Sequence, residues 1–241
     1  TSQWITGPDA RADVHRRLRA ELVSTALEGA AGAREALSRL GLSGQRVGVV
    51  AASPAPAASG SPRADQQLLA ERERFTDALA VHLSAVQPGA AVALIGDTAY
   101  GILPAPDDDA GARLVRVAED FLERVGERMP ALIAVGPPAD DIAGIAQSRA
   151  TALRVLRVLR ERPGTRRAAR MADVQTASLM LELRDLVQTR GEGPTGPIER
   201  LVAYDRDHDA HLVATLRAWL EQFGDVTAAA EATFVHPNTF R

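Results

Sequence analysis

The chain has 241 residues, 46% of them hydrophobic, and its 28 basic and 31 acidic residues give a net charge of −3. This length suits two or three compact units, and no apolar run reaches the roughly 18 residues needed to span a bilayer. Cysteine and lysine are both absent. Their absence excludes disulfides, thiolate metal ligands, a cysteine nucleophile, Schiff-base chemistry and a lysine-containing phosphate loop.

The N-terminal residues TSQWITGPDARADVHRRLRAEL lack the basic-then-apolar order of a secretory signal, so we expect a cytoplasmic protein. Apolar residues at helical spacing between positions 9 and 40 predict two short helices closed by Gly41. RVGVVAAS, at 46–53, predicts a buried strand, and a flexible loop rich in proline and serine follows it. The next helix has a predicted inward face of Leu68, Leu69, Phe75, Leu79 and Leu83.

A β-hairpin comes next, because the apolar runs AVALIG and AYGILP are separated only by Asp97 and Thr98. Residues 110–129 then predict an amphipathic helix and 131–138 a short strand. Residues 140–162 predict another helix, after which RRAARMADV returns toward the sheet. This order suits an open mixed sheet with helices on one face.

The hairpin and the helix after it, ALIGDTAYGILPAPDDDAGARLVRVAEDFLERV, resemble the centre of the GGDEF fold of diguanylate cyclases. Cyclases of that family need two glycines at the turn for close approach to a guanine nucleotide, and acidic residues that hold Mg²⁺. Here the turn reads Ile95, Gly96, Asp97, Thr98, so one glycine and the glutamate are missing. We therefore predict no catalytic residue, no cofactor and no cyclase activity, with Asp97 interpreted as a turn residue.

Three charged clusters lie outside the hairpin turn. Asp107–Asp109 and the pair Asp140 and Asp141 precede helices, so capping and the helix dipole explain them better than a metal ion. His208 and His211 could place two imidazoles on one helix face, but a solvated helix start is the favoured interpretation. One run of arginines is interpreted as a solvated face, in preference to a surface that contacts DNA phosphate or an anionic ligand. That run contains Arg149, Arg154, Arg157, Arg160, Arg162, Arg166, Arg167 and Arg170.

The C-terminal residues predict two packed helices and the start of a third. Gly224 ends the first helix and Asp225 caps the second. The third begins at Pro237, with His236 as its cap and Val235 and Phe240 as a hydrophobic staple. The apolar face of the first helix is predicted to hold Leu212, Leu216, Trp219, Leu220 and Phe223, and the inward face of the second Val226, Ala229, Ala230 and Thr233.

A long helix, a short helix, a turn and a new helix are typical of helix-turn-helix DNA binding, in which the start of the last helix contacts base edges. Asn238, the single asparagine of the chain, can pair with adenine, and Thr239 can reach a base or a phosphate. Arg241 is expected to contact the DNA backbone. The predicted DNA-binding residues are Thr227, His236, Pro237, Asn238, Thr239 and Arg241.

The stretch from 197 to 241 resembles the C-terminal helix-turn-helix domain of the PucR/CdaR family of bacterial transcriptional regulators. The resemblance lies in LVAYD at 201–205, LVATLRAWL, the pair Ala229 and Ala230, and VHPNTFR. A degenerate GGDEF-like domain precedes this module in that family, so the resemblance covers most of residues 45–241. Thr233 stands where the family usually has leucine, and Pro237 where it often has arginine. The family motif continues with a YRLRR-like run that is absent here, so we expect a truncated chain.

Together these features predict an α+β protein: a mixed sheet with flanking helices, followed by an all-α helix-turn-helix module. The expected divisions are an N-terminal helical segment at 1–44, a GGDEF-like sensing or dimerising domain at 45–180 and an incomplete DNA-binding domain at 181–241. The expected partners are operator DNA, a second copy of the chain and a small-molecule effector, and no membrane. A scaffold or a residual nucleotide-binding protein is the alternative. From 201 to 241, three arginines stand against six acidic residues, a poor balance for holding phosphate.

Overall fold

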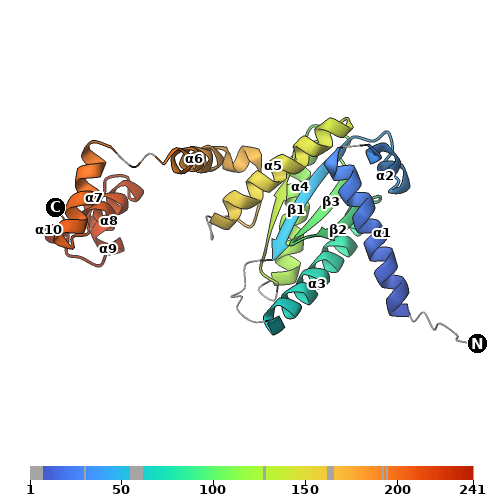
Figure 1. Cartoon of the computed structure of the whole chain (residues 1–241), viewed down its shortest axis with the longest axis horizontal. Helices are drawn as coiled ribbons and strands as arrows, with labels where there is room; N and C mark the ends of the chain where they lie inside the picture. The colour runs from blue at the N-terminus through green and yellow to red at the C-terminus, as the bar shows by residue number, and fades with distance from the viewer. Residues whose placement is uncertain are drawn as a thin grey trace, which may run out of the picture. The chain divides into compact units, whose positions relative to one another are not determined.

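The computed structural model describes most of the chain as two compact units, Thr1–Leu181 and Glu182–Arg241. The first unit carries a β-sheet and the second is helical (Figure 1). The predicted α+β class is confirmed, whereas the predicted boundaries of three domains stay a prediction. The described residues are 8–29, 31–54, 62–126, 129–161, 166–191, 193 and 195–240.

The described part of the first unit contains a five-stranded mixed sheet with the order β2-β3-β1-β4-β5. Neighbouring strands are antiparallel except β4 and β5, which are parallel. The chain returns to the sheet after residue 166, as predicted. The strands are β1 (Val47–Pro54), β2 (Ala91–Ile95), β3 (Thr98–Pro104), β4 (Ala131–Val135) and β5 (Ala168–Arg170).

Helices cover both faces of this sheet, so the prediction of helices on one face is wrong (Figure 1). Strand β1 gives the reason: Val49 and Ala51 join one core, and Val50 and Ala52 join the core on the opposite face. A continuous apolar strand indicates burial on both faces. The helices α1 (Pro8–Glu28), α2 (Ala33–Arg39) and α5 (Ile142–Glu161) pack on the first face, and α3 (Pro62–Val86) and α4 (Ala110–Val125) on the second.

Four local predictions need correction. The first predicted short helix is the 21-residue helix α1. Leu69 of α3 is 49% exposed and does not belong to the inward face of that helix. The hairpin turn is Gly96–Asp97, because Ile95 pairs with Thr98; Gly96 has φ +64°, a conformation that glycine adopts without strain. The predicted loop after β1 covered residues 54–66, but Pro54 belongs to β1 and residues 62–66 belong to α3. Its remaining residues, 55–61, lie outside the described residues.

Helix α6 (Met171–Arg190) starts directly after β5, and its Met171 and Val174 pack against the core of the first unit. The described helices include none that is long and apolar enough to cross a membrane. The remaining helices are α7 (Pro197–His208), α8 (Leu212–Glu221), α9 (Val226–Ala232) and α10 (Pro237–Phe240).

Candidate DNA-binding site

The connection between α7 and α8 is held by Asp205, the last residue of LVAYD. Its carboxylate accepts hydrogen bonds from the backbone N–H groups of Leu212 and Val213, at 2.8 and 2.9 Å. These groups start α8 and have no acceptor within their own helix. Asp205 therefore caps α8 from the preceding helix. This contact could not be predicted from the sequence, because Asp205 stands seven positions before Leu212, beyond the spacing of a local cap.

Asp205→Ala is expected to destabilise the C-terminal module by about 1 to 2 kcal/mol, since it removes both acceptors from the first turn of α8. Asp207→Ala is the matched control, as this exposed carboxylate lies on the same helix. Urea denaturation of both variants, followed by circular dichroism, measures the difference. Equal stability of the two variants would contradict the assigned role of Asp205.

The two histidines of DRDHDAH do not share a helix. Asp209 adopts a left-handed conformation, with φ +51°, and ends α7, so His208 closes α7 while His211 precedes α8. The alternative of two imidazoles on one helix face therefore does not apply, and His211 stands at the start of α8. The His208 ring stacks on Tyr204 with centroids 4.0 Å apart. Among the described residues, no group of three histidine or acidic side chains is arranged to hold a metal ion.

The junction of α8 and α9 follows the predicted helix signals. Gly224 has φ +88°, and a Cβ at this position would lie 3.4 Å from the Trp219 ring, so glycine suits both the backbone and the packing. The Asp225 carboxylate accepts hydrogen bonds from the N–H groups of Thr227 and Ala228, at 2.8 and 3.1 Å. The predicted cap at Asp225 is confirmed.

The packing of the module rests on alanine. Ala229 and Ala230 of α9 are fully buried, as predicted. The predicted apolar face of α8, however, is wrong at four positions, because Leu212, Trp219 and Leu220 are 40%, 38% and 60% exposed and Phe223 is fully exposed. Phe223 lies beyond the end of α8 with φ +52°, and this turn removes it from the helix face.

The turn between α9 and α10 also agrees with the predicted signals. The Thr233 hydroxyl donates to the Ala229 carbonyl at 2.9 Å, so this threonine is satisfied within α9. Helix α10 begins at Pro237, and Nδ1 of His236 accepts a hydrogen bond from the Asn238 N–H at 3.2 Å. His236 is therefore the cap of α10, as predicted. The staple between Val235 and Phe240 stays a prediction.

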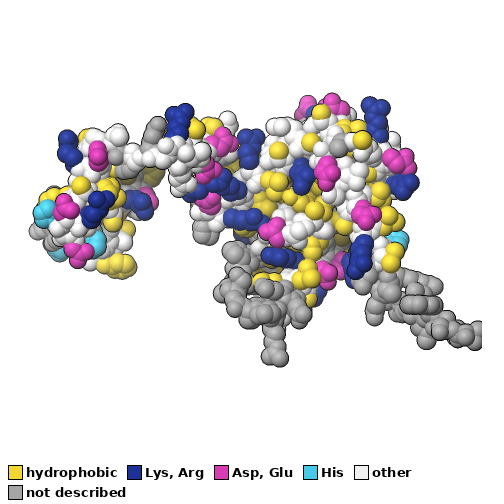
Figure 2. All heavy atoms as spheres, in the orientation of Figure 1, with side chains coloured by type: hydrophobic (Ala, Val, Ile, Leu, Met, Phe, Trp, Pro, Cys, Tyr) yellow, Lys and Arg dark blue, Asp and Glu magenta, His cyan; other side chains and the backbone are white. Residues whose placement is uncertain are grey.

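The predicted DNA-binding residues fall at the starts of two helices. Thr227 is exposed in the first turn of α9, and Asn238 is exposed in the first turn of α10. Pro237 and Thr239 belong to α10, whereas Arg241 lies outside the described residues. On the face shown in Figure 2, basic, acidic and histidine side chains are interspersed over this module.

The degenerate hairpin turn of the first unit is engaged in structural contacts. The Asp97 carboxylate accepts a hydrogen bond from the Thr98 hydroxyl at 3.0 Å. Its other oxygen lies 4.0 Å from a guanidinium nitrogen of Arg160 on α5. These contacts fit the interpretation of Asp97 as a turn residue, because they tie the hairpin to the neighbouring helix.

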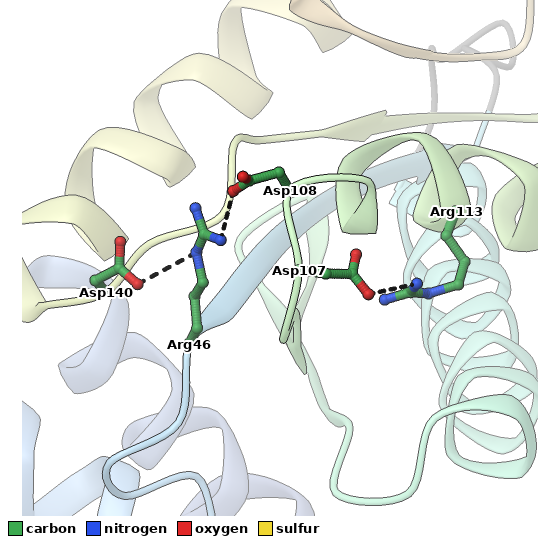
Figure 3. Close-up of polar contacts among 5 residues, drawn as sticks. All are labelled: Arg46, Asp107, Asp108, Arg113 and Asp140. Carbon is green, nitrogen blue, oxygen red and sulfur yellow. Dashed lines mark hydrogen bonds and ion pairs between the residues drawn. The ribbon is translucent and has the colours of Figure 1, made fainter.

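Three aspartates of the acidic clusters form ion pairs with arginine side chains (Figure 3). Arg46 reaches Asp108 at 2.7 Å and Asp140 at 3.2 Å, and so joins the chain before α4 to the chain before α5. The hydrogen bond that the Arg46 guanidinium donates to the Asp108 carboxylate raises the pKa of Arg46 above its usual value, so this cation remains charged. Asp107 pairs with Arg113 at 2.9 Å. The capping interpretation is thus wrong for these three aspartates, which bind arginine side chains.

Capping does hold for Asp141, whose carboxylate accepts a hydrogen bond from the Gly144 N–H at 2.6 Å. Several members of the arginine run also make contacts within the first unit. The Arg149 guanidinium lies 5.3 Å from the centre of the Tyr100 ring, and Arg157 pairs with Glu161 at 3.0 Å. Such contacts favour a structural role for these arginines over a DNA-binding one.

Comparison with known families matches both units. Residues 24–158 match the GGDEF-like domain, and residues 212–241 match the PucR C-terminal helix-turn-helix domain. The first match covers more than half of the chain, so the chain belongs to the GGDEF-like domain family. The family resemblance predicted from the sequence is confirmed. The two matches place the chain among DNA-binding transcriptional regulators and do not indicate a catalytic family.

A crystal structure of a regulator of polyketide synthase expression from Bifidobacterium adolescentis also matches. The TM-score is 0.40 and the identity is 14%, over 94% of this chain and 85% of that one. Among curated proteins, no relative matches. The assignment therefore rests on the two family matches.

Proposed function

We propose that this protein is a cytoplasmic transcriptional regulator that binds operator DNA as a homodimer, with the start of α10 in the major groove. The observation that carries this proposal is the capped order of α8, α9 and α10. Asp225 fixes the start of α9, His236 fixes the start of α10, and Asn238 is exposed in the first turn that follows. In helix-turn-helix proteins the start of the last helix contacts the bases.

The proposed contacts divide into base reading and backbone positioning. The Asn238 amide can donate to N7 and accept from N6 of adenine, which distinguishes this base from the other three. Thr239 and Pro237 belong to the same short helix and are proposed to lie beside the bases. Thr227 and Arg241 are proposed to contact phosphates. His236 contributes through its cap, because its Nδ1 is already used by the Asn238 N–H.

The acidic character of the module limits which groups can hold phosphate. The Asp225 carboxylate occupies the first N–H groups of α9, so these donors are not available to DNA. Thr227 must therefore act through its exposed hydroxyl. With a local charge of −3 from 201 to 241, we expect a shallow dependence of affinity on salt.

Selection from a library of genomic DNA fragments tests this function. The full-length protein, tagged and incubated at low salt, is expected to enrich fragments with two related half-sites about one helical turn apart. Sequencing of the retained fragments gives the half-site. Retention without sequence enrichment, or no retention at any salt concentration, would contradict the proposal and favour a protein-binding scaffold.

We further propose that the GGDEF-like unit senses a small molecule and does not synthesise one. A cavity of about 370 Å³ lies between α1, α3 and the edge strand β2, within the size range of small-molecule sites. Arg17 on α1 suits an anionic group, and Glu73 and Asp77 on α3 suit a hydrogen-bond donor. Arg19, which also lines the cavity, donates a hydrogen bond to the Ala90 carbonyl at 3.0 Å. Basic and acidic side chains line the same cavity, and this observation supports the binding of a small-molecule effector.

A thermal-shift screen of purines, nucleotides and sugar acids tests the sensing role. At least one compound is expected to raise the melting temperature by a few degrees, since a ligand that binds only the folded state stabilises it. Product formation from GTP and Mg²⁺ is measured on the same samples, and none is expected. Turnover of GTP would contradict the proposal that this unit does not synthesise a nucleotide product. A screen without any stabilisation would leave dimerisation as the role of this unit.

A further inference from the structure

Helix α6 has two apolar faces, of which one is already packed. Met171 and Val174 contact the core of the first unit, and Ser178 on the same side is 5% exposed. The opposite side carries five large apolar side chains that are each 41 to 55% exposed. They form what we call the α6 stripe: Leu179, Met180, Leu183, Leu186 and Val187.

The spacing of the α6 stripe is that of a helix-pairing face. Leu179, Leu183 and Leu186 are separated by four and three residues, the alternation that brings side chains to one seam between two helices. At about 100° per residue, the whole stripe covers an arc of about 120°. The arc contains no charged residue between Leu179 and Val187. A second helix with a matching apolar face would cover it.

We propose that α6 pairs with α6 of a second copy of this chain, parallel and in register, through the α6 stripe. The charges beside the stripe support this partner and this direction. Glu182 and Arg184 lie on opposite flanks of Leu183, each about 100° from it around the helix. In a parallel pair, the two Glu182 side chains lie on opposite sides of the seam and stay apart. In an antiparallel pair centred on Leu183, like charges face each other.

The parallel direction also fits the proposed homodimeric DNA binding, on which this inference rests in part. Each α6 leads into the helix-turn-helix module of its own chain, because α7 starts at Pro197, soon after α6 ends at Arg190. A parallel pair therefore directs both modules from the same end of the seam. This arrangement suits a dimer that binds two half-sites on one DNA duplex.

The lack of cysteine in the chain permits a direct test of the seam. The test uses three single-cysteine variants: Leu179→Cys, Leu186→Cys and Gln188→Cys. Disulfide formation on oxidation shows which of these positions lies next to the same position of the second copy. A parallel pair is expected to form disulfide-linked dimers at both 179 and 186, since equivalent seam positions lie within disulfide distance. Gln188, on the helix side away from Leu183, is the control and is expected to stay unlinked. Linkage at only one of the two leucine positions would overturn the parallel direction.

Sedimentation of the full-length protein without DNA tests the stripe separately from DNA binding. Leu183→Glu is expected to weaken dimerisation at least tenfold, whereas Gln188→Glu adds the same charge to the same helix outside the stripe and is expected to remain dimeric. Circular dichroism confirms that both variants are folded. A wild-type monomer at 100 µM, or a Leu183→Glu variant as dimeric as the wild type, would overturn the inference. DNA selection with the same samples decides the proposed function independently, because a monomer can still bind one half-site.

Discussion

Replacing Gly136 with alanine is expected to destabilise the sheet unit by about 3 kcal/mol, the upper part of the range for overpacked cores. Gly136 directly follows β4, and its N–H donates to the Val49 carbonyl at 2.8 Å. A Cβ at this position would clash with the carbonyl oxygen and the Oγ of Ser148 on α5. The carbonyl belongs to the helix backbone and cannot rotate away, so α5 would have to move off the sheet.

A double variant identifies the atoms responsible for this effect. If the Oγ of Ser148 caused the clash, Ser148→Ala would restore the stability lost in Gly136→Ala. We expect no such rescue, because the carbonyl oxygen of residue 148 remains in place. Ser148→Ala alone should cost less, since it removes only the hydrogen bond to the Pro137 carbonyl and the acceptor for the Val49 N–H. Urea denaturation curves measure all three variants. A Gly136→Ala protein within 1 kcal/mol of the wild type would contradict the backbone clash.

Local signals in the sequence predicted the caps of the candidate site correctly. Asp225 and His236 bind N–H groups two or three residues ahead, and Pro237 needs no partner, so each signal is contained in a few neighbouring residues. The burial of Ala229 and Ala230 was also predicted correctly, because a helix with small residues on its inner face can approach its neighbour closely.

Contacts between residues far apart in the sequence could not be predicted from such local signals. Arg46 and Asp108 are 62 positions apart, so nothing near Asp108 indicated an ion pair in place of a helix cap. The turn at Asp209 separates His208 from His211, although their spacing alone allowed both on one helix face. The apolar run of β1 did contain the signal for helices on both faces, since both alternating sets of side chains are apolar. Phe223 is exposed because its backbone adopts a left-handed conformation, which is rare for phenylalanine and was not expected from the sequence.

Asn238→Ala is expected to weaken binding to the selected operator by about 1 to 3 kcal/mol, or about 5- to 150-fold, and to relax preference at one base position. The fold of the module should be unchanged, because the link between Asn238 and the His236 cap uses the backbone N–H, which alanine retains. The substitution therefore separates base reading from helix capping. Fluorescence anisotropy with the operator and with single-base variants of it measures both affinity and preference.

His236→Ala is the informative contrast, since it removes the cap acceptor and leaves the Asn238 amide in place. We expect this variant to lower the stability of the module by about 1 kcal/mol and to weaken binding to all sequences alike. If Asn238→Ala stays folded and keeps wild-type affinity and preference, Asn238 does not read a base. Base recognition would then belong to residues other than the first turn of α10. If both variants instead lose affinity uniformly, α10 positions the module on the DNA backbone without reading its sequence.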